Sequence, residues 1–156
     1  MKEGLIEQLK MQEKFFLNTI SCFTEEDSAY KPNEEMYTVA QHIGHTAETV
    51  SWFLEGAFGD KGFDINFDNY TEKMKEKYNS FDATVAQFKD AVAKGIALVS
   101  DAPDSELTAP ITAQIMTGAP KMAVVGAIGE HTAHHRGNLA VYARLAGKTP
   151  KMPYGE

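Results

Sequence analysis

Apolar residues recur every three or four positions in four separate stretches of this chain, which is the spacing of an amphipathic helix. We expect helices over residues 2–23, 39–59, 82–100 and from after Pro120 to about residue 146. Polar turn segments separate these stretches, and no long strand-like run competes with them. The pattern predicts an all-α fold, a four-helix bundle with long loops, whose sites form in the core from side chains on facing helices.

Capping residues mark the expected ends of these helices. Thr38 is expected to cap the second helix, with Gln41 at the capping-box position three residues later. Asp82 is expected to cap the third helix. Gly147 is expected to be the left-handed residue that ends the fourth helix, because Pro150 follows just beyond it.

Two connections between the helices are expected to hold local structure. The connection over residues 59–69 is long, and its aromatic side chains are expected to pack inward. A short helical turn is expected to follow over residues 70–78. Residues 108–117 are rich in β-branched side chains, which favours a short hairpin or an extended loop. No linker interrupts the pattern, so residues 1–156 are expected to form one domain.

The charge balance excludes two classes of partner. The chain has 15 basic and 22 acidic residues and a formal net charge of −7, without a basic stripe. Nucleic-acid binding and binding to anionic membranes are therefore not expected. The longest nearly uncharged apolar run, residues 122–129, is far shorter than the ~18 residues of a membrane span. The start of the chain lacks the pattern of a signal peptide, and Cys22 is the only cysteine, so a soluble cytoplasmic protein is expected.

All five histidines lie in two clusters, His42 and His45 on the second helix and His131, His134 and His135 on the fourth. The helical period places His131 and His135 together on the buried stripe of the fourth helix. Residues four apart on a helix have Cβ atoms about 5–6 Å apart, close enough for two imidazoles to share one ion. Histidines at this spacing form part of the helical zinc motifs. The pattern favours a divalent-metal site with imidazole donors, which suit Zn, Ni, Cu or Fe.

Two alternatives stay open from the residues alone. A single inward histidine is more often a hydrogen-bonded core residue than a ligand, so a bundle that binds no metal also fits the pattern. On the second helix, periodicity alone favours His42 as the inward residue. A ligand at the mouth of a cleft belongs on the flank of the apolar stripe, where His45 lies.

Three segments of the chain resemble motifs of the DinB-like (DinB/YfiT) superfamily. Residues 38–45, TVAQHIGH, resemble its S/T-V-x-E-x-x-x-H, and residues 131–138, HTAHHRGN, resemble its H-x-x-H-H-R-G-Q. Residues 145–155 resemble its C-terminal G-x-x-P…P-x-Y-G. One departure is Asn138, which stands where that family usually has glutamine.

The resemblance implies a metal-binding four-helix bundle with a defined ligand set. The ligands it implies are His45, His131 and His135, a facial triad that leaves open positions for water or substrate. It selects His45 over His42. His134 is expected to point aside, towards solvent or a neighbouring subunit, and the resemblance also implies a homodimer.

A three-histidine site with an open position allows two kinds of reaction. It can lower the pKa of a bound water to about 7, or it can deprotonate a low-molecular-weight thiol. We therefore expect a metal-dependent hydrolase or thiol S-transferase acting on a small molecule, and the resemblance to a family with thiol-dependent members agrees. Zn or Ni is the expected ion, followed by Fe or Mn. The alternative is a metal-binding bundle without catalysis, in which the ion joins the second and fourth helices.

Two side chains are candidates for catalytic roles by their proximity to the ligands. Glu48, one turn after His45, is a candidate general base, although a residue on that polar arc is commonly a solvated surface group. Arg136 is a candidate for binding a substrate carboxylate, because its guanidinium matches that geometry; more often such an arginine makes an interhelical salt bridge. The aromatic candidates for the wall of the cleft are Tyr37, Trp52 and Tyr142, although aromatic residues at helical spacing usually belong to the core.

Overall fold

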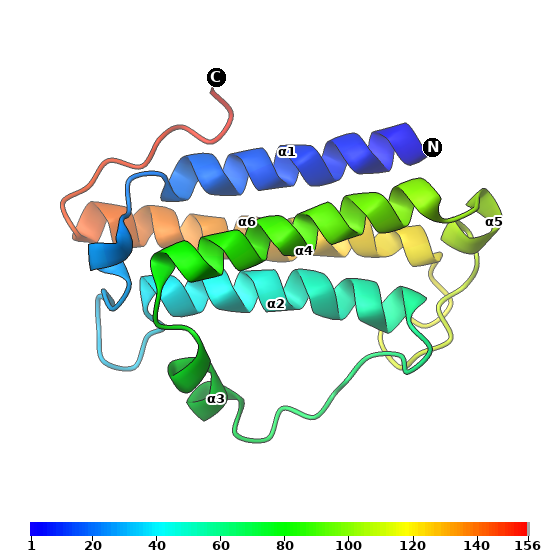
Figure 1. Cartoon of the computed structure of the whole chain (residues 1–156), viewed down its shortest axis with the longest axis horizontal. Helices are drawn as coiled ribbons and strands as arrows, with labels where there is room; N and C mark the ends of the chain where they lie inside the picture. Colours follow the sequence, from blue (N-terminus) through cyan, green and yellow to red (C-terminus); the bar gives the residue numbers. More distant parts are fainter. Residues whose placement is uncertain (156) are drawn as a thin grey trace.

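The computed structural model describes residues 1–155 and consists of helices and loops, without a strand in that range. Four long helices lie side by side and form the expected four-helix bundle (Figure 1). They are α1 (Lys2–Ile20), α2 (Val39–Phe58), α4 (Phe81–Asp101) and α6 (Val124–Leu145). The shorter elements are α3 (Tyr70–Lys77), α5 (Asp104–Leu107) and the 3-10 turns η1 (Glu25–Asp27) and η2 (Lys121–Ala123). Within residues 1–155, no helix combines the length and apolar character needed to cross a bilayer.

Each long helix packs against two of the others. Helix α1 packs on α4 and α6, and helix α2 packs on the same two helices from the opposite side. Figure 1 shows α2 and α1 on either side of the α4 and α6 pair. The two histidine-bearing helices, α2 and α6, are therefore direct neighbours, and side chains can meet between them.

The core contains the apolar residues that set the helical period. Phe16 of α1 packs on Phe88 of α4 with ring centroids 4.4 Å apart, and both side chains are fully buried. Along α2 and α6, buried apolar residues at the helical spacing of three or four positions continue the core. Its buried members there include Val39, Ile43, Ala47, Val50, Leu54, Val125, Ile128, Leu139 and Tyr142. Burial of these stripes stabilises the bundle and holds α2 and α6 in register.

The helix ends confirm two of the expected caps. The Thr38 hydroxyl accepts a hydrogen bond from the Gln41 N–H at 3.2 Å, and the Gln41 side chain accepts one from the Thr38 N–H at 2.9 Å. This is the reciprocal capping box that the sequence predicts. Gly147, with φ of 74°, takes the left-handed conformation at the end of α6.

The cap of α4 differs from the expectation. Helix α4 begins at Phe81, and the Ser80 hydroxyl accepts the hydrogen bond from the Ala83 N–H at 3.2 Å. The prediction that Asp82 caps this helix is wrong, because Asp82 already lies inside the first turn. Its own N–H donates to the Glu25 carboxylate at 2.8 Å, so a side chain from another segment also satisfies this helix end.

The connections follow the expectations in part. The turn expected over residues 70–78 is confirmed as α3, and residues 108–117 form a loop closed by an isolated antiparallel bridge between Pro110 and Pro120. Phe63 packs inward as expected, against Trp52. Phe67 does not, because it is 60% exposed. Ile65, between them, is 52% exposed, so of these three apolar residues only Phe63 joins the core.

Removing the cap of α2 tests how much the capping box contributes. We expect Thr38→Ala to lower the free energy of unfolding by about 1 kcal/mol, because the Gln41 N–H loses its acceptor. Urea denaturation measures the change. Thr38→Ser keeps the hydroxyl and is expected to match the wild type. Equal stability of Thr38→Ala and the wild type would contradict a contribution from this cap.

Candidate metal centre

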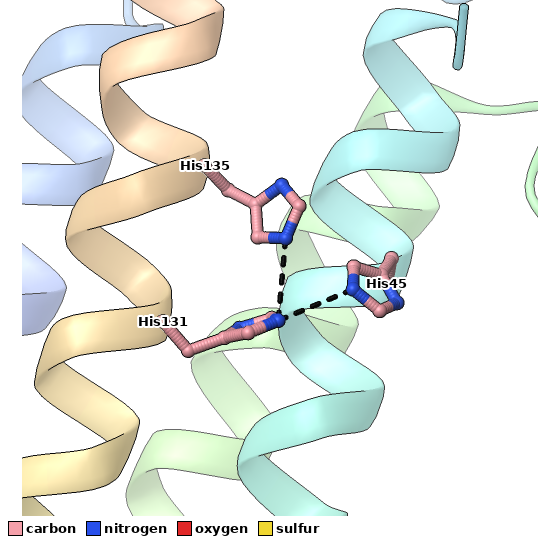
Figure 2. Close-up of side chains that lie close together, drawn as sticks. All are labelled: His45, His131 and His135. Atoms are coloured by element: carbon pink, nitrogen blue, oxygen red, sulfur yellow. Dashed lines mark hydrogen bonds between the residues drawn. The ribbon is translucent and has the colours of Figure 1, made fainter.

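Three histidine side chains meet between α2 and α6. His45 comes from α2, and His131 and His135 come from successive turns of α6 (Figure 2). The Nε2 atom of His131 lies 3.2 Å from Nε2 of His45 and 3.2 Å from Nε2 of His135. His135 is buried, and the other two are half-buried. The helical fold has thus gathered one nitrogen atom from each ring at a common point.

The geometry of these atoms fits a shared divalent ion. A zinc ion binds imidazole nitrogen at about 2.0–2.1 Å, so two ligands in a tetrahedral site lie about 3.3 Å apart. The observed 3.2 Å between neighbouring Nε2 atoms matches that spacing. All three donors are imidazoles, the donor type common to Zn, Ni and Fe sites. The cluster is therefore compatible with metal binding.

Burial keeps these imidazoles neutral, which is the state that binds a metal. It lowers the pKa of His131 to about 4, and the neighbouring histidines lower it in the same direction. Burial and the charge of His131 lower the pKa of His135 to about 2. Burial also lowers the pKa of His45, although the Glu48 carboxylate opposes this shift. At neutral pH the three rings carry lone pairs instead of positive charges.

His42 lies directly behind the cluster. It is only 6% exposed, so the period of α2 predicts its inward position correctly. Its Nδ1 atom is 3.0 Å from Nδ1 of His135, and its Nε2 atom is 3.1 Å from the Tyr142 hydroxyl. That hydroxyl donates to the backbone carbonyl of Tyr37 at 2.9 Å. His42 therefore contacts the outer nitrogen of His135 and does not join the convergent group.

A second set of polar side chains lies behind His45. The Tyr70 hydroxyl is 2.6 Å from Nδ1 of His45, and it donates to the Glu48 carboxylate at 2.9 Å. The other oxygen of Glu48 accepts from Lys77 at 2.9 Å. Burial alone raises the pKa of Glu48, but hydrogen bonds from Lys77 and Tyr70 outweigh it and lower the pKa below the usual value. Glu48 is thus an ionised carboxylate that holds Tyr70 against His45.

Sequence reasoning missed Tyr70. The residue lies 25 positions after His45, at the start of the short helix α3, and no spacing along the chain connects the two. The predicted helical turn over residues 70–78 was the only available signal. Its contact with His45 depends on how α3 folds back onto α2.

The structure does not bring Arg136 into the cluster. Its guanidinium lies over the rings of Phe15 and Tyr154, 5.6 and 5.5 Å from their centroids, and donates to the Tyr154 hydroxyl at 3.3 Å. His134 is exposed and accepts from the Asn138 amide at 3.3 Å. Both side chains thus make their contacts away from the point where the three rings meet.

A cleft of about 1060 Å³ adjoins the cluster and is lined by His45 and His131. Trp52 and Phe67 contribute aromatic walls, and Lys77 contributes a charged group. Among the other aromatic residues considered for the cleft, Tyr142 is a buried core residue. Tyr37 is half-buried, with its ring centroid 6.0 Å from that of His45. A small molecule in the cleft can reach the half-buried side of the cluster.

The lowered pKa values predict a pH dependence for the metal-free protein. Burial lowers the pKa of His42 and of His131 to about 4 in the folded state, whereas an unfolded histidine titrates at about 6.5. The unfolded chain therefore binds more protons below pH 6.5. The stability contribution is complete above that value and is lost as the pH falls towards 4.

Thermal unfolding in a chelator at pH 7.5 and pH 5 measures this effect. We expect a lower Tm at pH 5, by about 2–4 °C for each kcal/mol lost in a chain of this size. His42→Phe is expected to reduce the difference, because it removes one of the groups responsible. Equal Tm values for the wild type at the two pH values would contradict the assignment of neutral buried histidines.

Comparison with known proteins places the chain in a family. A model of the DinB superfamily matches residues 8–139, which is most of the chain. A DinB-like protein from Bacillus cereus ATCC 10987 is 18% identical with a TM-score of 0.71, over 95% of this chain and 94% of that one. The DinB-like protein YjoA from Bacillus subtilis is 18% identical with a TM-score of 0.66, over 95% of each chain.

These two solved structures share the fold of this chain. Among curated proteins, no match to the sequence was found. The resemblance noted from the two histidine motifs is confirmed by the family match, which spans both of them. The chain therefore belongs to the DinB superfamily.

Proposed function

We propose that this chain binds one divalent metal ion through His45, His131 and His135 and uses it in hydrolysis or thiol S-transfer on a small molecule. The observation that supports this most strongly is the convergence of three neutral imidazole nitrogens beside a cleft. Three protein ligands are typical of catalytic sites, which keep a position open, whereas closed structural sites use four.

Some residues around the cluster would bind the ion, and others would bind a substrate. A bound divalent ion supplies a Lewis acid suited to hydrolysis or to activation of a thiol. His45 and His131 hold it at the cleft, where Trp52 and Phe67 offer apolar surfaces to a small organic molecule. Zn or Ni is the ion expected for an all-imidazole donor set, with Fe or Mn next.

Of the two side chains with predicted catalytic roles, only Glu48 lies at this cleft. Each of its oxygens already accepts one hydrogen bond, from Tyr70 or from Lys77. The contacts therefore favour a role for Glu48 in orienting Tyr70, and its action as a general base stays a prediction. We assign no carboxylate-binding role to Arg136, because its contacts lie with Phe15 and Tyr154.

A substrate panel tests the catalytic part of the proposal. Protein loaded with Zn, Ni or Mn is assayed with esters and with pairs of a low-molecular-weight thiol and an electrophile. We expect turnover by the wild type and by His134→Ala, and loss of turnover in His131→Ala. Neither binding nor turnover of any compound by the loaded wild type would overturn the proposed activity.

A second candidate function is a structural ion without catalysis. It is favoured by the position of the three rings, which would let one ion join the adjacent helices α2 and α6. Either function predicts stabilisation by metal, about 2.7 kcal/mol at a free concentration 100 times Kd. Only an open site exchanges ligands, so a thiol added to the Co(II) form is expected to change its visible spectrum. An unchanged spectrum would favour the structural ion.

A further inference from the structure

A series of hydrogen bonds leads to His135, and the donor and the acceptor of each bond can be assigned. It begins at the backbone carbonyl of Tyr37, which can only accept. The Tyr142 hydroxyl therefore donates its one proton to that carbonyl, at 2.9 Å. The lone pairs of the Tyr142 oxygen are left to accept from Nε2–H of His42, at 3.1 Å.

The donor and acceptor roles of His42 follow from this assignment. A neutral imidazole carries one proton, so a proton on Nε2 leaves Nδ1 of His42 as an acceptor. His42 is neutral because it is 6% exposed and neither of its ring nitrogens contacts a carboxylate. Nδ1 of His135, 3.0 Å away, must then be the donor. Since His135 is neutral too, its Nε2 atom carries a lone pair, and this is the atom that faces His131.

The same rule applies independently to His45. The Glu48 carboxylate can only accept, so the Tyr70 hydroxyl donates to it at 2.9 Å. The Tyr70 oxygen then accepts from Nδ1–H of His45 at 2.6 Å, and Nε2 of His45 is left with a lone pair. Two separate obligatory acceptors, a carbonyl and a carboxylate, therefore select the same tautomer in two of the three rings.

We propose that His42 and Tyr142 are positioning residues that hold His135 in its Nδ1-protonated tautomer, so that the Nε2 lone pair is set before an ion binds. Tyr70 and Glu48 do the same for His45. This inference rests on the proposed metal site. In the other tautomer, a proton would occupy the ligand atom of His135, and the bond to His42 would break on binding. Removing such an outer partner typically weakens metal binding about 10–100-fold.

Two substitutions of His42 separate this role from simple packing. His42→Phe keeps an aromatic ring at this position but removes the acceptor for His135, and we expect its Zn affinity to fall about 10–100-fold. His42→Asn places an amide oxygen near the position of Nδ1, and we expect it to bind more tightly than His42→Phe. Affinity is measured by competition with a chelator, and thermal unfolding shows that each variant is folded.

The tautomer itself is read from the histidine ¹⁵N resonances of the metal-free protein. We expect His135 to be Nδ1-protonated in the wild type and in His42→Asn, and to become a mixture in His42→Phe and Tyr142→Phe. The exposed His134 is expected to be unchanged in all of them. A His135 tautomer that does not respond to His42→Phe would overturn the inference.

The outcomes for this inference and for the proposed function are distinct. If the wild type binds Zn and folded His42→Phe binds it equally well, the positioning role fails while the metal site stands. If the wild type binds no ion, the proposed function fails, and the ¹⁵N spectra still decide whether His42 sets the tautomer of His135.

Discussion

His131→Ala is expected to weaken divalent-metal binding by on the order of 100-fold or more. Its Nε2 atom is the central member of the cluster, 3.2 Å from the matching atoms of both His45 and His135. Zinc bound by four ligands gains about 10–16 kcal/mol, so each ligand contributes several kcal/mol, and each 1.4 kcal/mol is a factor of about ten in Kd. Competition titration with a chromophoric chelator measures the loss for Zn and Ni.

His134→Ala is the matched control for this experiment. It removes an imidazole from the same helix, three residues further on. That ring is exposed and accepts a hydrogen bond from the Asn138 amide. We expect its metal affinity to equal that of the wild type. A similar loss in His134→Ala and His131→Ala would indicate nonspecific binding to surface histidines and would contradict the assigned site.

Phe16→Ala is expected to destabilise the fold by about 3–5 kcal/mol, the range for truncating a fully buried phenylalanine. Phe16 is 0% exposed and packs its ring on Phe88, so the substitution leaves a cavity between α1 and α4. Stability is measured by urea denaturation with the linear extrapolation. The site lies between the other pair of helices, so the folded variant is expected to keep its metal stoichiometry.

Phe67→Ala is the matched control, because it makes the same chemical change at a side chain that is 60% exposed. We expect a change within about 0.5 kcal/mol, as for most surface substitutions. If both variants lost the same stability, the assignment of Phe16 to the core and of Phe67 to the surface would be contradicted.

The helical part of the fold could be predicted because its signals are local. The spacing of apolar residues determines where a stripe can form, and the box of Thr38 and Gln41 lies within four consecutive residues. Expectations failed where a competing or distant group decided the outcome. Ser80 provides an acceptor two residues before Asp82, and Glu25, far away in the chain, binds the Asp82 N–H.

In the candidate site, too, local signals could be predicted and contacts between distant segments could not. The helical period brings His131 and His135 together, and it correctly places His42 inside the bundle. It does not distinguish a ring that meets the other two from a ring behind them, because that depends on how α2 and α6 face each other. Tyr70, which lies 25 residues after His45, is recognised only once α3 is folded against α2.

Metal content of the untagged wild-type protein, measured by plasma mass spectrometry, tests the central claim most directly. After exposure to Zn, Ni and Mn and removal of excess metal, we expect about one ion per chain. We expect that ion to be lost in His45→Ala and His131→Ala and kept in His134→Ala. A wild type that holds no ion after the same treatment would contradict the metal site and leave a bundle with four buried or half-buried histidines, His42 included.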